Sequence, residues 1–323
     1  MSQPVVAVVG PTAAGKSDLA VALAARIGGE IVNVDAYQVY RGMDVGTAKL
    51  PEDERGGVPH HLLDVLDVTD SATVAEFQEW ARAAIAEIRG RGAVPVLVGG
   101  SALYVRAVVD AFEFPGTDPE VRARLEEELR TQGPEAMHRR LAAQDPPAAA
   151  SILVSNGRRI VRALEVIEIT GRPFAASLPA HASFYEDVRL IGVDVPRGVL
   201  DDRITRRVDR MWDAGLVDEV RELGEGLASS RTASRALGYA QVLAFLAGEM
   251  SEDEARDATV RGTRKFARRQ DSWFRKDPRI VWLPYDAPDL VERAVGVSIA
   301  SRLDQREWGG VDQREWGGVD QRE

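Results

Sequence analysis

The sequence predicts an α/β fold in which a parallel β-sheet carries an all-helical insertion, and three observations support this prediction. Short apolar runs such as Val5–Val9 and Val94–Val98 alternate with helical segments in the first part of the chain. Such runs are typical of strands buried on both faces of a parallel sheet. Residues 115–183 are instead rich in Arg, Glu and Ala and show helical patterns only. A further strand, Val188–Val195, follows them, so the helical segment is inserted between strands of one sheet.

The elements can be placed in chain order from these patterns. In residues 1–114 we expect the strand Val5–Val9, the strand Glu30–Asp35, the helix Ala72–Arg89, the strand Val94–Val98 and the helix Leu103–Val109. The helix over 72–89 is predicted because Val74, Phe77, Ala81 and Ile85 fall on one face. In the insertion, 115–183, we expect helices over Pro119–Gln132, Pro134–Gln144, Pro146–Leu153 and Gly157–Thr170. In residues 184–303 we expect the strand Val188–Val195, helices over Arg197–Leu223, Ala236–Ala247 and Ser251–Lys276, the strand Ile280–Leu283 and the helix Leu290–Leu303.

The last segment, residues 304–323, is an eight-residue repeat. Asp304–Val311 recurs as residues 312–319, and each copy contains a Gly-Gly pair. This period fits neither a helix nor a solenoid unit. We expect a disordered tail; the alternative is an interaction tail that carries Trp308 and Trp316.

Composition limits the class of protein. There is no cysteine in the 323 residues, which excludes a disulfide framework, a thiolate zinc site and a cysteine nucleophile. We find neither an N-terminal signal pattern nor an apolar run of membrane-spanning length, and therefore expect a cytoplasmic protein that binds no membrane. The net charge of −10 argues against a general nucleic-acid coat. Basic clusters at Arg158–Arg162, Arg203–Arg210 and Arg261–Lys276 are nevertheless suited to binding a polyanion on one face.

The motif Gly10-Pro-Thr-Ala-Ala-Gly-Lys-Ser17 lies between the first strand and the apolar helical run Leu19–Ala24. Strand, glycine-rich loop and helix in this order form a P-loop, whose backbone N–H groups point at phosphate oxygens. Lys16 supplies a positive charge, and the Ser17 hydroxyl can ligate Mg²⁺. The predicted diphosphate or triphosphate site comprises Gly10, Pro11, Thr12, Ala13, Ala14, Gly15, Lys16 and Ser17, with Mg²⁺ at Ser17. A glycine-rich turn that binds nothing is the alternative, but it leaves Lys16 unexplained.

The carboxylates near this loop do not follow the pattern of P-loop proteins that hydrolyse or transfer ATP phosphate. Proteins that hydrolyse or transfer ATP phosphate usually end a second core strand with an acid that holds Mg²⁺. Here Val94–Val98 is followed by Gly99-Gly100-Ser101, which weakens a motor or GTPase interpretation. Asp35, at the end of the second strand, faces whatever is bound above the P-loop. It could hold Mg²⁺, take a proton from a nucleophile or cap a helix that begins at Ala36.

Several segments then follow one another in the order of a known family. They are Gly10–Ser17, Asn33–Lys49, Pro59–Asp64, Val98–Tyr104, Asp118–Arg122, Arg158–Val166, Ser234–Tyr239 and Ala267–Arg275. The chain resembles bacterial tRNA dimethylallyltransferases, the isopentenyltransferases that modify adenosine 37 beside the anticodon. The resemblance extends to about residue 303 and leaves the repeated tail out. It implies a P-loop NTPase-like core with a helical tRNA-binding insertion.

The resemblance implies roles for three catalytic residues. The P-loop of the family grips the diphosphate of dimethylallyl diphosphate, the alkyl donor, so no nucleotide hydrolysis is needed. Asp35 matches the general base on the adenine N6 amine. Ser101 matches a position usually filled by threonine, whose hydroxyl lies near the departing diphosphate oxygen. Arg207 matches an arginine that contacts the donor diphosphate. Arg203 and Arg207 share a helix face, which suits a diphosphate, although a solvated basic face is the alternative.

The resemblance also implies tRNA contacts. The family clamps the anticodon stem-loop between the core and the insertion and flips the target base. The matching positions are Asp35, Ala36, Tyr37, Gln38, Ser101, Arg122, Arg158, Arg159, Arg162, Arg235, Gly238, Tyr239, Arg268, Arg269, Gln270, Trp273 and Arg275. Among them, Gln38 and Gln270 are candidates for reading base edges. Trp273 is a candidate for stacking, although a helical Trp is more often part of a core. We expect the acting unit to be a monomer.

Two other functions remain as alternatives. A small-molecule P-loop kinase would have a similar core, but it needs neither the basic run 261–276 nor the helical insertion. A P-loop RNA-binding module without catalysis would not need Asp35 and Arg207. Incidental binding of ATP in the P-loop stays open.

Overall fold

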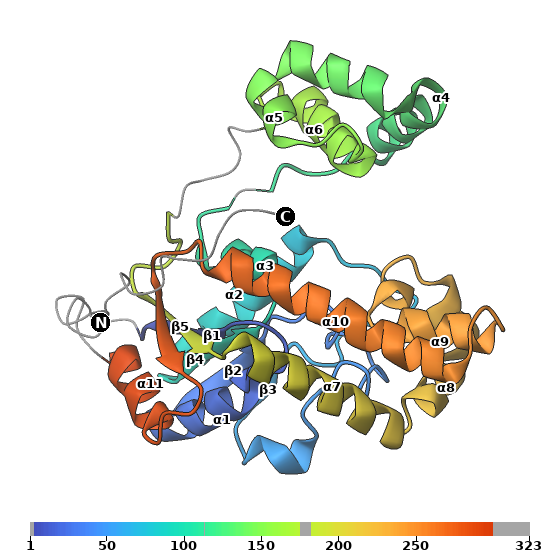
Figure 1. Cartoon of the computed structure of the whole chain (residues 1–323). Coiled ribbons are helices and arrows are strands. Elements are labelled where there is room, and N and C mark those ends of the chain that lie inside the picture. Colours follow the sequence, from blue (N-terminus) through green and yellow to red (C-terminus); the bar gives the residue numbers. More distant parts are fainter. Residues whose placement is uncertain (1–2, 113, 175–181, 300–323) are drawn as a thin grey trace. The chain divides into compact units, whose positions relative to one another are not determined.

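The computed structural model describes residues 3–112, 114–174 and 182–299. The chain divides into two compact units: the core unit, formed by residues up to Val109 and from Tyr185 onward, and the helical unit, Asp110–Phe184 (Figure 1).

The core unit is built on a parallel sheet. Within the described residues its strands run in the order β3-β2-β4-β1-β5-β6, and all adjacent pairs are parallel. Their bounds are β1 Val5–Val9, β2 Gly29–Asn33, β3 His60–His61, β4 Val94–Gly99, β5 Val188–Asp194 and β6 Ile280–Pro284. The predicted α/β class with a parallel sheet is therefore confirmed; the two-residue edge strand β3 was not predicted.

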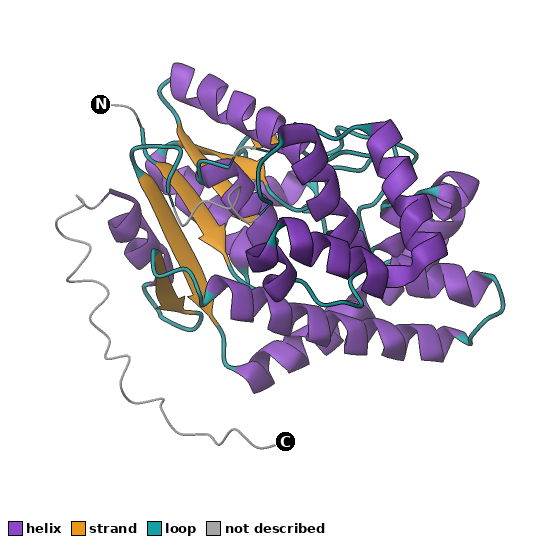
Figure 2. Ribbon diagram, turned by 90° about the horizontal axis from the view of Figure 1, so that it is seen from above, coloured by secondary structure: helices purple, strands orange, loops and turns teal. Residues whose placement is uncertain are grey.

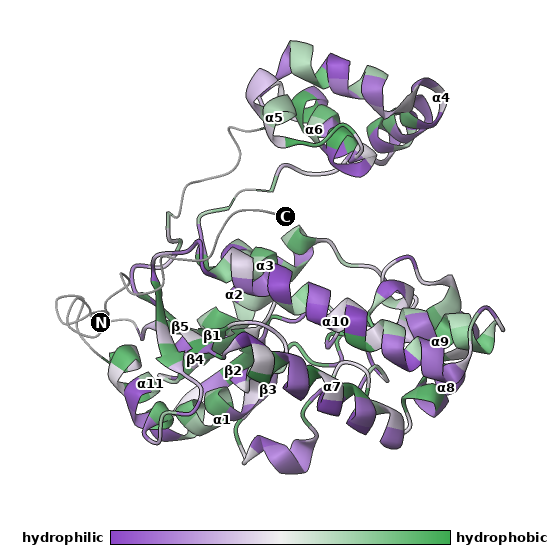
Figure 3. Cartoon of the chain, viewed as in Figure 1, coloured by the Kyte–Doolittle hydropathy of each residue, from purple (hydrophilic) through white to green (hydrophobic). Residues whose placement is uncertain are grey.

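Helices cover both faces of this sheet (Figure 2). Val6 and Val8 of β1 pack in one hydrophobic cluster with α1 (Lys16–Ile27) and α11 (Leu290–Ile299). Residues with the opposite side-chain direction, such as Val5 and Val9, pack in a second cluster with α2 (Val74–Gly90) and α3 (Ala102–Val109). Strands buried on both faces account for the continuous apolar runs. Figure 3 shows the contrast between these hydrophobic strands and the largely hydrophilic α7 and α10.

Further helices belong to the core unit. They are η1 (Glu52–Arg55), α7 (Arg197–Asp213), α8 (Leu216–Ser229), η3 (Ala233–Arg235), α9 (Tyr239–Leu246) and α10 (Glu252–Phe274). The prediction of one helix over 197–223 is wrong, because Gly215 takes a left-handed conformation with φ of 92° and separates α7 from α8. The first turn of α10 is fixed by a capping box between Ser251 and Glu254.

The helical unit contains α4 (Pro119–Gln144), α5 (Pro146–Ser151) and α6 (Gly157–Thr170). The backbone leaves helical geometry at Gly133 (φ 79°, ψ 165°), just before Pro134, so α4 consists of the two predicted segments. Its core comprises Leu125, Met137, Leu141, Ala148, Ile160 and Leu164. The predicted all-helical insertion is confirmed.

Two sequence predictions lie outside the described residues: the part of the last helix beyond Ile299, and the repeated tail 304–323. No helix in the described ranges is both long enough and apolar enough to cross a membrane.

Candidate functional site

The loop between β1 and α1 wraps back on itself. Gly10 and Gly15 have positive φ angles of 137° and 94°, and Ala13, at 64°, is also left-handed. Such angles favour glycine, which is why the two glycines frame the motif. The Lys16 ammonium donates a hydrogen bond to the Pro11 carbonyl oxygen at 2.7 Å, so the side chain curls over the loop.

The charge of Lys16 is destabilised where it lies. Burial, reinforced by the charge of Arg207, lowers the pKa of Lys16 to about 7, and the carboxylate of Asp35 acts in the opposite direction. An anion placed beside the ammonium would reverse this effect. The P-loop is thus poised for a negatively charged ligand.

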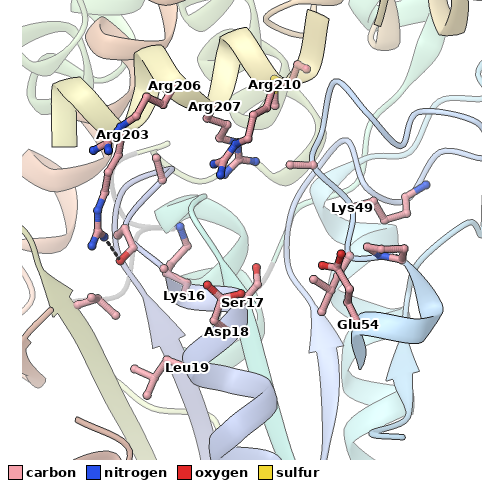
Figure 4. A pocket seen from close by; sticks show the side chains of 18 of the residues that line it. Lys16, Ser17, Asp18, Leu19, Lys49, Glu54, Arg203, Arg206, Arg207 and Arg210 are labelled. Atoms are coloured by element: carbon pink, nitrogen blue, oxygen red, sulfur yellow. Dashed lines mark hydrogen bonds between the residues drawn. The ribbon is translucent and has the colours of Figure 1, made fainter. Parts of the chain in front are cut away.

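Four arginines of α7 line the same cleft as the P-loop (Figure 4). They are spaced at i, i+3, i+4 and i+7 and therefore share one helix face: Arg203, Arg206, Arg207 and Arg210. Arg206 and Arg210 were not predicted as site residues, although this spacing was a signal for them. The cleft has a volume of about 1280 Å³, and its other walls come from Asp18, the 44–51 segment and Tyr285.

Backbone carbonyls hold two of these arginines. Arg203 donates to the Ala14 carbonyl oxygen at 3.2 Å, and its guanidinium lies 4.5 Å from the centre of the Tyr285 ring. Arg207 donates to the carbonyl oxygen of Thr47 at 3.2 Å. Burial is the main cause that lowers the pKa of Arg207. Because a carbonyl carries no net charge, both guanidinium charges remain available to an anion in the cleft.

Asp35 lies two residues beyond β2 rather than at its end. Its Oδ1 accepts a hydrogen bond from the Tyr37 backbone N–H at 2.9 Å, which closes a local turn. No helix follows, so the helix-cap alternative is wrong. The half-buried carboxylate raises the pKa values of Lys16 and Arg207 through its charge. Asp35 and the predicted diphosphate cations therefore share one electrostatic environment.

Ser101 is held near the P-loop through Gln270 of α10. The Gln270 Oε1 accepts from the Thr12 N–H at 2.9 Å, and its Nε2 donates to the Gly100 carbonyl oxygen at 2.8 Å. The side chain is buried, and a Cβ at Gly100 would lie 2.3 Å from that Nε2. Both ends of the Gln270 amide therefore join the P-loop to the Ser101 loop, and a base-edge contact by Gln270 stays a prediction.

The other predicted tRNA contacts of the core differ in exposure. Tyr239 is fully buried and donates its hydroxyl hydrogen to Glu219, and Gly238 beside it is also buried. Contacts of these two residues with tRNA stay predictions. Ala36 and Tyr37 are half-buried, and Gln38 donates to the Thr47 carbonyl oxygen at 3.2 Å. Trp273 is 55% exposed, so the core alternative for it is wrong. Three further positions are exposed, namely Arg235, Arg268 and Arg269.

Arg275 is exposed at the end of α10 but already has acidic partners. It forms ion pairs with Asp194 and with Asp271, and its guanidinium lies 4.0 Å from the centre of the Trp282 ring. Its charge is therefore partly neutralised within the core unit.

In the helical unit, two predicted tRNA contacts are ion-pair partners of one buried carboxylate. Glu165 is fully buried and accepts from Arg122 Nε at 3.0 Å and from Arg162 Nη1 at 2.8 Å. Burial raises the pKa of Glu165, but the hydrogen bonds from Arg122, Thr117 and Arg162 outweigh burial and lower it overall. Arg122 and Arg162 therefore share the charge of Glu165 within the helical unit, and their contacts with tRNA stay predictions. Arg158 and Arg159 are exposed.

Known proteins resemble the chain along most of its length. The family model "IPP transferase" matches residues 38–277. A tRNA dimethylallyltransferase of Streptomyces avermitilis is 69% identical over 289 residues, which are 89% of this chain and 92% of that protein. The crystal structure of the full-length tRNA isopentenylpyrophosphate transferase from Bacillus halodurans is 40% identical, covers 92% of this chain and 94% of its own, and has a TM-score of 0.67.

A eukaryotic dimethylallyltransferase, whose crystal structures capture it acting on tRNA, shares the fold. It covers 95% of this chain and 80% of its own, with a TM-score of 0.82 and 24% identity. The family match and the highly similar bacterial relatives agree with the P-loop core and the arginine-lined cleft. The chain therefore belongs to the IPP transferase family, that of the tRNA dimethylallyltransferases.

Proposed function

We propose that the protein transfers a dimethylallyl group from dimethylallyl diphosphate to N6 of adenosine 37 in the tRNA anticodon loop and releases diphosphate. Family membership supports a prenyl transfer to tRNA. The donor assignment depends on one observation: Lys16 and the arginines of α7 line the same cleft. The sequence resemblance supplies the choice of adenosine 37.

The cations of the cleft suit the leaving group. As the bond between the allylic carbon and oxygen breaks, negative charge accumulates on the diphosphate. Lys16 and Arg207 are already fixed on carbonyl oxygens, so they stabilise this charge without first breaking an ion pair. The bidentate shape of a guanidinium matches two phosphate oxygens.

A magnesium ion fits this site only as a partner of the diphosphate. No cluster of three or more histidines, aspartates or glutamates that could hold a metal occurs in the described part of the chain. Ser17 is exposed at the first turn of α1, with Asp18 beside it. Mg²⁺ commonly keeps several waters and binds through few protein groups plus phosphate oxygens, so Ser17 and the donor would hold it. When bound, the ion would neutralise part of the diphosphate charge.

Asp35 is proposed as the general base. The exocyclic N6 amine is a weak nucleophile, and removing its proton as the C–N bond forms lowers the barrier. The turn to Tyr37 fixes one carboxylate oxygen and leaves the other for the amine proton. The Ser101 hydroxyl would donate to the departing oxygen, from a loop that Gln270 joins to the P-loop.

The proposed tRNA contacts are the exposed residues of both units: Arg158, Arg159, Arg235, Arg268, Arg269 and Trp273. Arginines there would contact phosphates and supply affinity, whereas stacking on Trp273 would act on a base. We propose a monomer as the acting unit, because the P-loop, Asp35 and Arg207 all belong to one chain. The tRNA substrate supports a cytoplasmic location.

The decisive experiment is mass spectrometry of nucleosides from unmodified tRNA incubated with the protein, dimethylallyl diphosphate and Mg²⁺. We expect one adenosine per substrate tRNA to gain a dimethylallyl group, without ATP. Omitting the donor is the matched control. Absence of product, or a strict need for ATP, would reject this function in favour of kinase-type chemistry.

A further inference from the structure

The loop from Asp44 to Gly46 wraps around the carboxylate of a helix residue that lies far away in sequence. Glu219 of α8 accepts hydrogen bonds from three consecutive backbone N–H groups: Asp44 at 3.0 Å, Val45 at 2.6 Å and Gly46 at 3.1 Å. Backbone N–H groups that converge in this way form an anion-binding concavity. Here a side chain of the protein itself occupies it.

Tyr239 of α9 completes the arrangement. Its hydroxyl donates to the same Glu219 carboxylate, and burial together with the charge of Glu219 raises the pKa of Tyr239, so the hydroxyl keeps its proton. The approach is close: a Cβ at Gly46 would lie 2.4 Å from Tyr239 Cε2 and 2.8 Å from Leu216 Cδ1. Glycine at position 46 is therefore required, and the loop has little freedom to shift.

The next residue of this loop contacts the diphosphate site. The Thr47 carbonyl oxygen accepts from Arg207 Nη2 at 3.2 Å and from Gln38 Nε2 at 3.2 Å. Within the described residues this is the hydrogen bond that holds the Arg207 guanidinium. The position of the Thr47 carbonyl thus decides where that guanidinium lies, and Glu219 fixes the three residues before it.

We infer that Glu219 and Tyr239 are positioning residues for the diphosphate site and act through the Asp44–Thr47 loop on Arg207. Neither side chain lines the cleft, so neither can touch the ligand there. They act by preorganising the binding site, because an arginine that is already held in place loses less conformational freedom when the diphosphate binds. The identity of the donor in this inference rests on the proposed function, whereas the presence of a diphosphate site does not.

The test measures binding of inorganic diphosphate with Mg²⁺ to the full chain by titration calorimetry. Glu219→Gln keeps the side-chain size but gives up the charge and one acceptor, and Tyr239→Phe removes only the donor. We expect Glu219→Gln to weaken diphosphate binding by about three- to tenfold, the range that the net contribution of a typical hydrogen bond spans, and Tyr239→Phe to weaken it less. Glu222→Gln, an exposed glutamate of the same helix, is the matched control and should leave binding unchanged.

A double-mutant cycle separates positioning from general loss of stability. If Glu219 acts through Arg207, Glu219→Gln should add nothing to the loss already caused by Arg207→Ala. A lower melting temperature with unchanged diphosphate affinity would overturn the inference, and so would additive losses in the double variant. If Glu219→Gln does not fold, the Tyr239→Phe cycle with Arg207→Ala decides by the same criteria.

Failure of the proposed function would look different. In that case the wild-type protein would form no prenylated tRNA but would still bind diphosphate, and Glu219→Gln and Arg207→Ala would still be coupled in the diphosphate titrations. A wild-type protein that does not bind diphosphate would overturn both.

Discussion

The core cleft and the helical unit both gather arginines, but they hold these side chains in opposite ways. In the cleft, Arg203 and Arg207 donate to the backbone carbonyls of Ala14 and Thr47. In the helical unit, Arg122 and Arg162 converge on one fully buried carboxylate, that of Glu165.

The difference has an electrostatic consequence. A carbonyl dipole orients a guanidinium without cancelling its charge, so the cleft keeps positive charge for an anion. A buried carboxylate needs compensation by opposite charge, so the arginines around it stabilise the fold and have little charge left to offer. The partner of an arginine therefore indicates its role better than the density of arginines along the sequence.

The largest expected effect concerns the carboxylate of the cleft, Asp35. Unlike Glu165, it has no ion pair within the described residues. If it is the base, Asp35→Asn should lower kcat by a factor on the order of 10²–10⁴ with small changes in substrate KM. Steady-state kinetics of tRNA prenylation measure both constants. Asp53→Asn, an exposed carboxylate of η1, is the control. A kcat near that of the wild type in Asp35→Asn would remove Asp35 from the mechanism.

In the helical unit, we expect the loss of an arginine to affect stability rather than catalysis. Arg122→Ala leaves Glu165 buried with one arginine fewer and should lower the free energy of unfolding by about 2 kcal/mol, since a buried charged acceptor loses a donor. Denaturant unfolding measures this, and the KM for the donor should not change. Arg130→Ala, which breaks an exposed pair with Glu127, should cost at most about 0.5 kcal/mol. Unchanged stability together with weaker tRNA binding in Arg122→Ala would support the predicted tRNA contact of Arg122 and contradict the comparison.

The pH dependence of diphosphate binding tests whether the charge of the cleft is truly available. The pKa of Lys16 in the free protein is about 7. A bound anion raises this pKa, so the complex holds more protons than the free protein above pH 7. Diphosphate affinity should therefore fall as the pH rises from 7 to 9, by up to about tenfold per pH unit. Titration calorimetry measures the slope, and Lys16→Gln should remove most of it. The same slope in Lys16→Gln would assign the proton to another group.

The fold could be predicted from the sequence because its signals are local. Apolar runs mark the strands, the glycines of the P-loop fix its shape, and Gly133 before Pro134 marks the break in α4. The break between α7 and α8 was missed, although Gly215 provided a signal. A glycine inside a strong helical pattern is ambiguous until its φ is known.

The site could be predicted only in part, because partners far apart in sequence decide the roles of polar side chains. Gln270 joins Thr12 to Gly100, and Tyr239 meets Glu219 beneath the loop at Gly46. A basic or polar motif does not reveal whether its residues lie exposed or are already hydrogen-bonded. The P-loop could be predicted without knowing distant partners, because its hydrogen-bond donors are its own backbone N–H groups.

The smallest expected effect separates two arginines of the same helix. Arg159 is exposed at the first turn of α6, whereas Arg162, one turn later, pairs with Glu165. If Arg159 contacts a tRNA phosphate, Arg159→Ala should weaken tRNA binding a few-fold and flatten the log–log salt dependence by about one unit. Arg162→Ala should lower the melting temperature of the protein and leave that slope almost unchanged, because its charge is already compensated. Binding titrations over a range of salt concentrations, with the donor KM as an internal control, measure both. Equal salt-dependence slopes for Arg159→Ala and the wild type would place Arg159 away from tRNA. A salt-dependence slope that is flatter by one unit in Arg162→Ala would show that an arginine paired with Glu165 still contacts the nucleic acid.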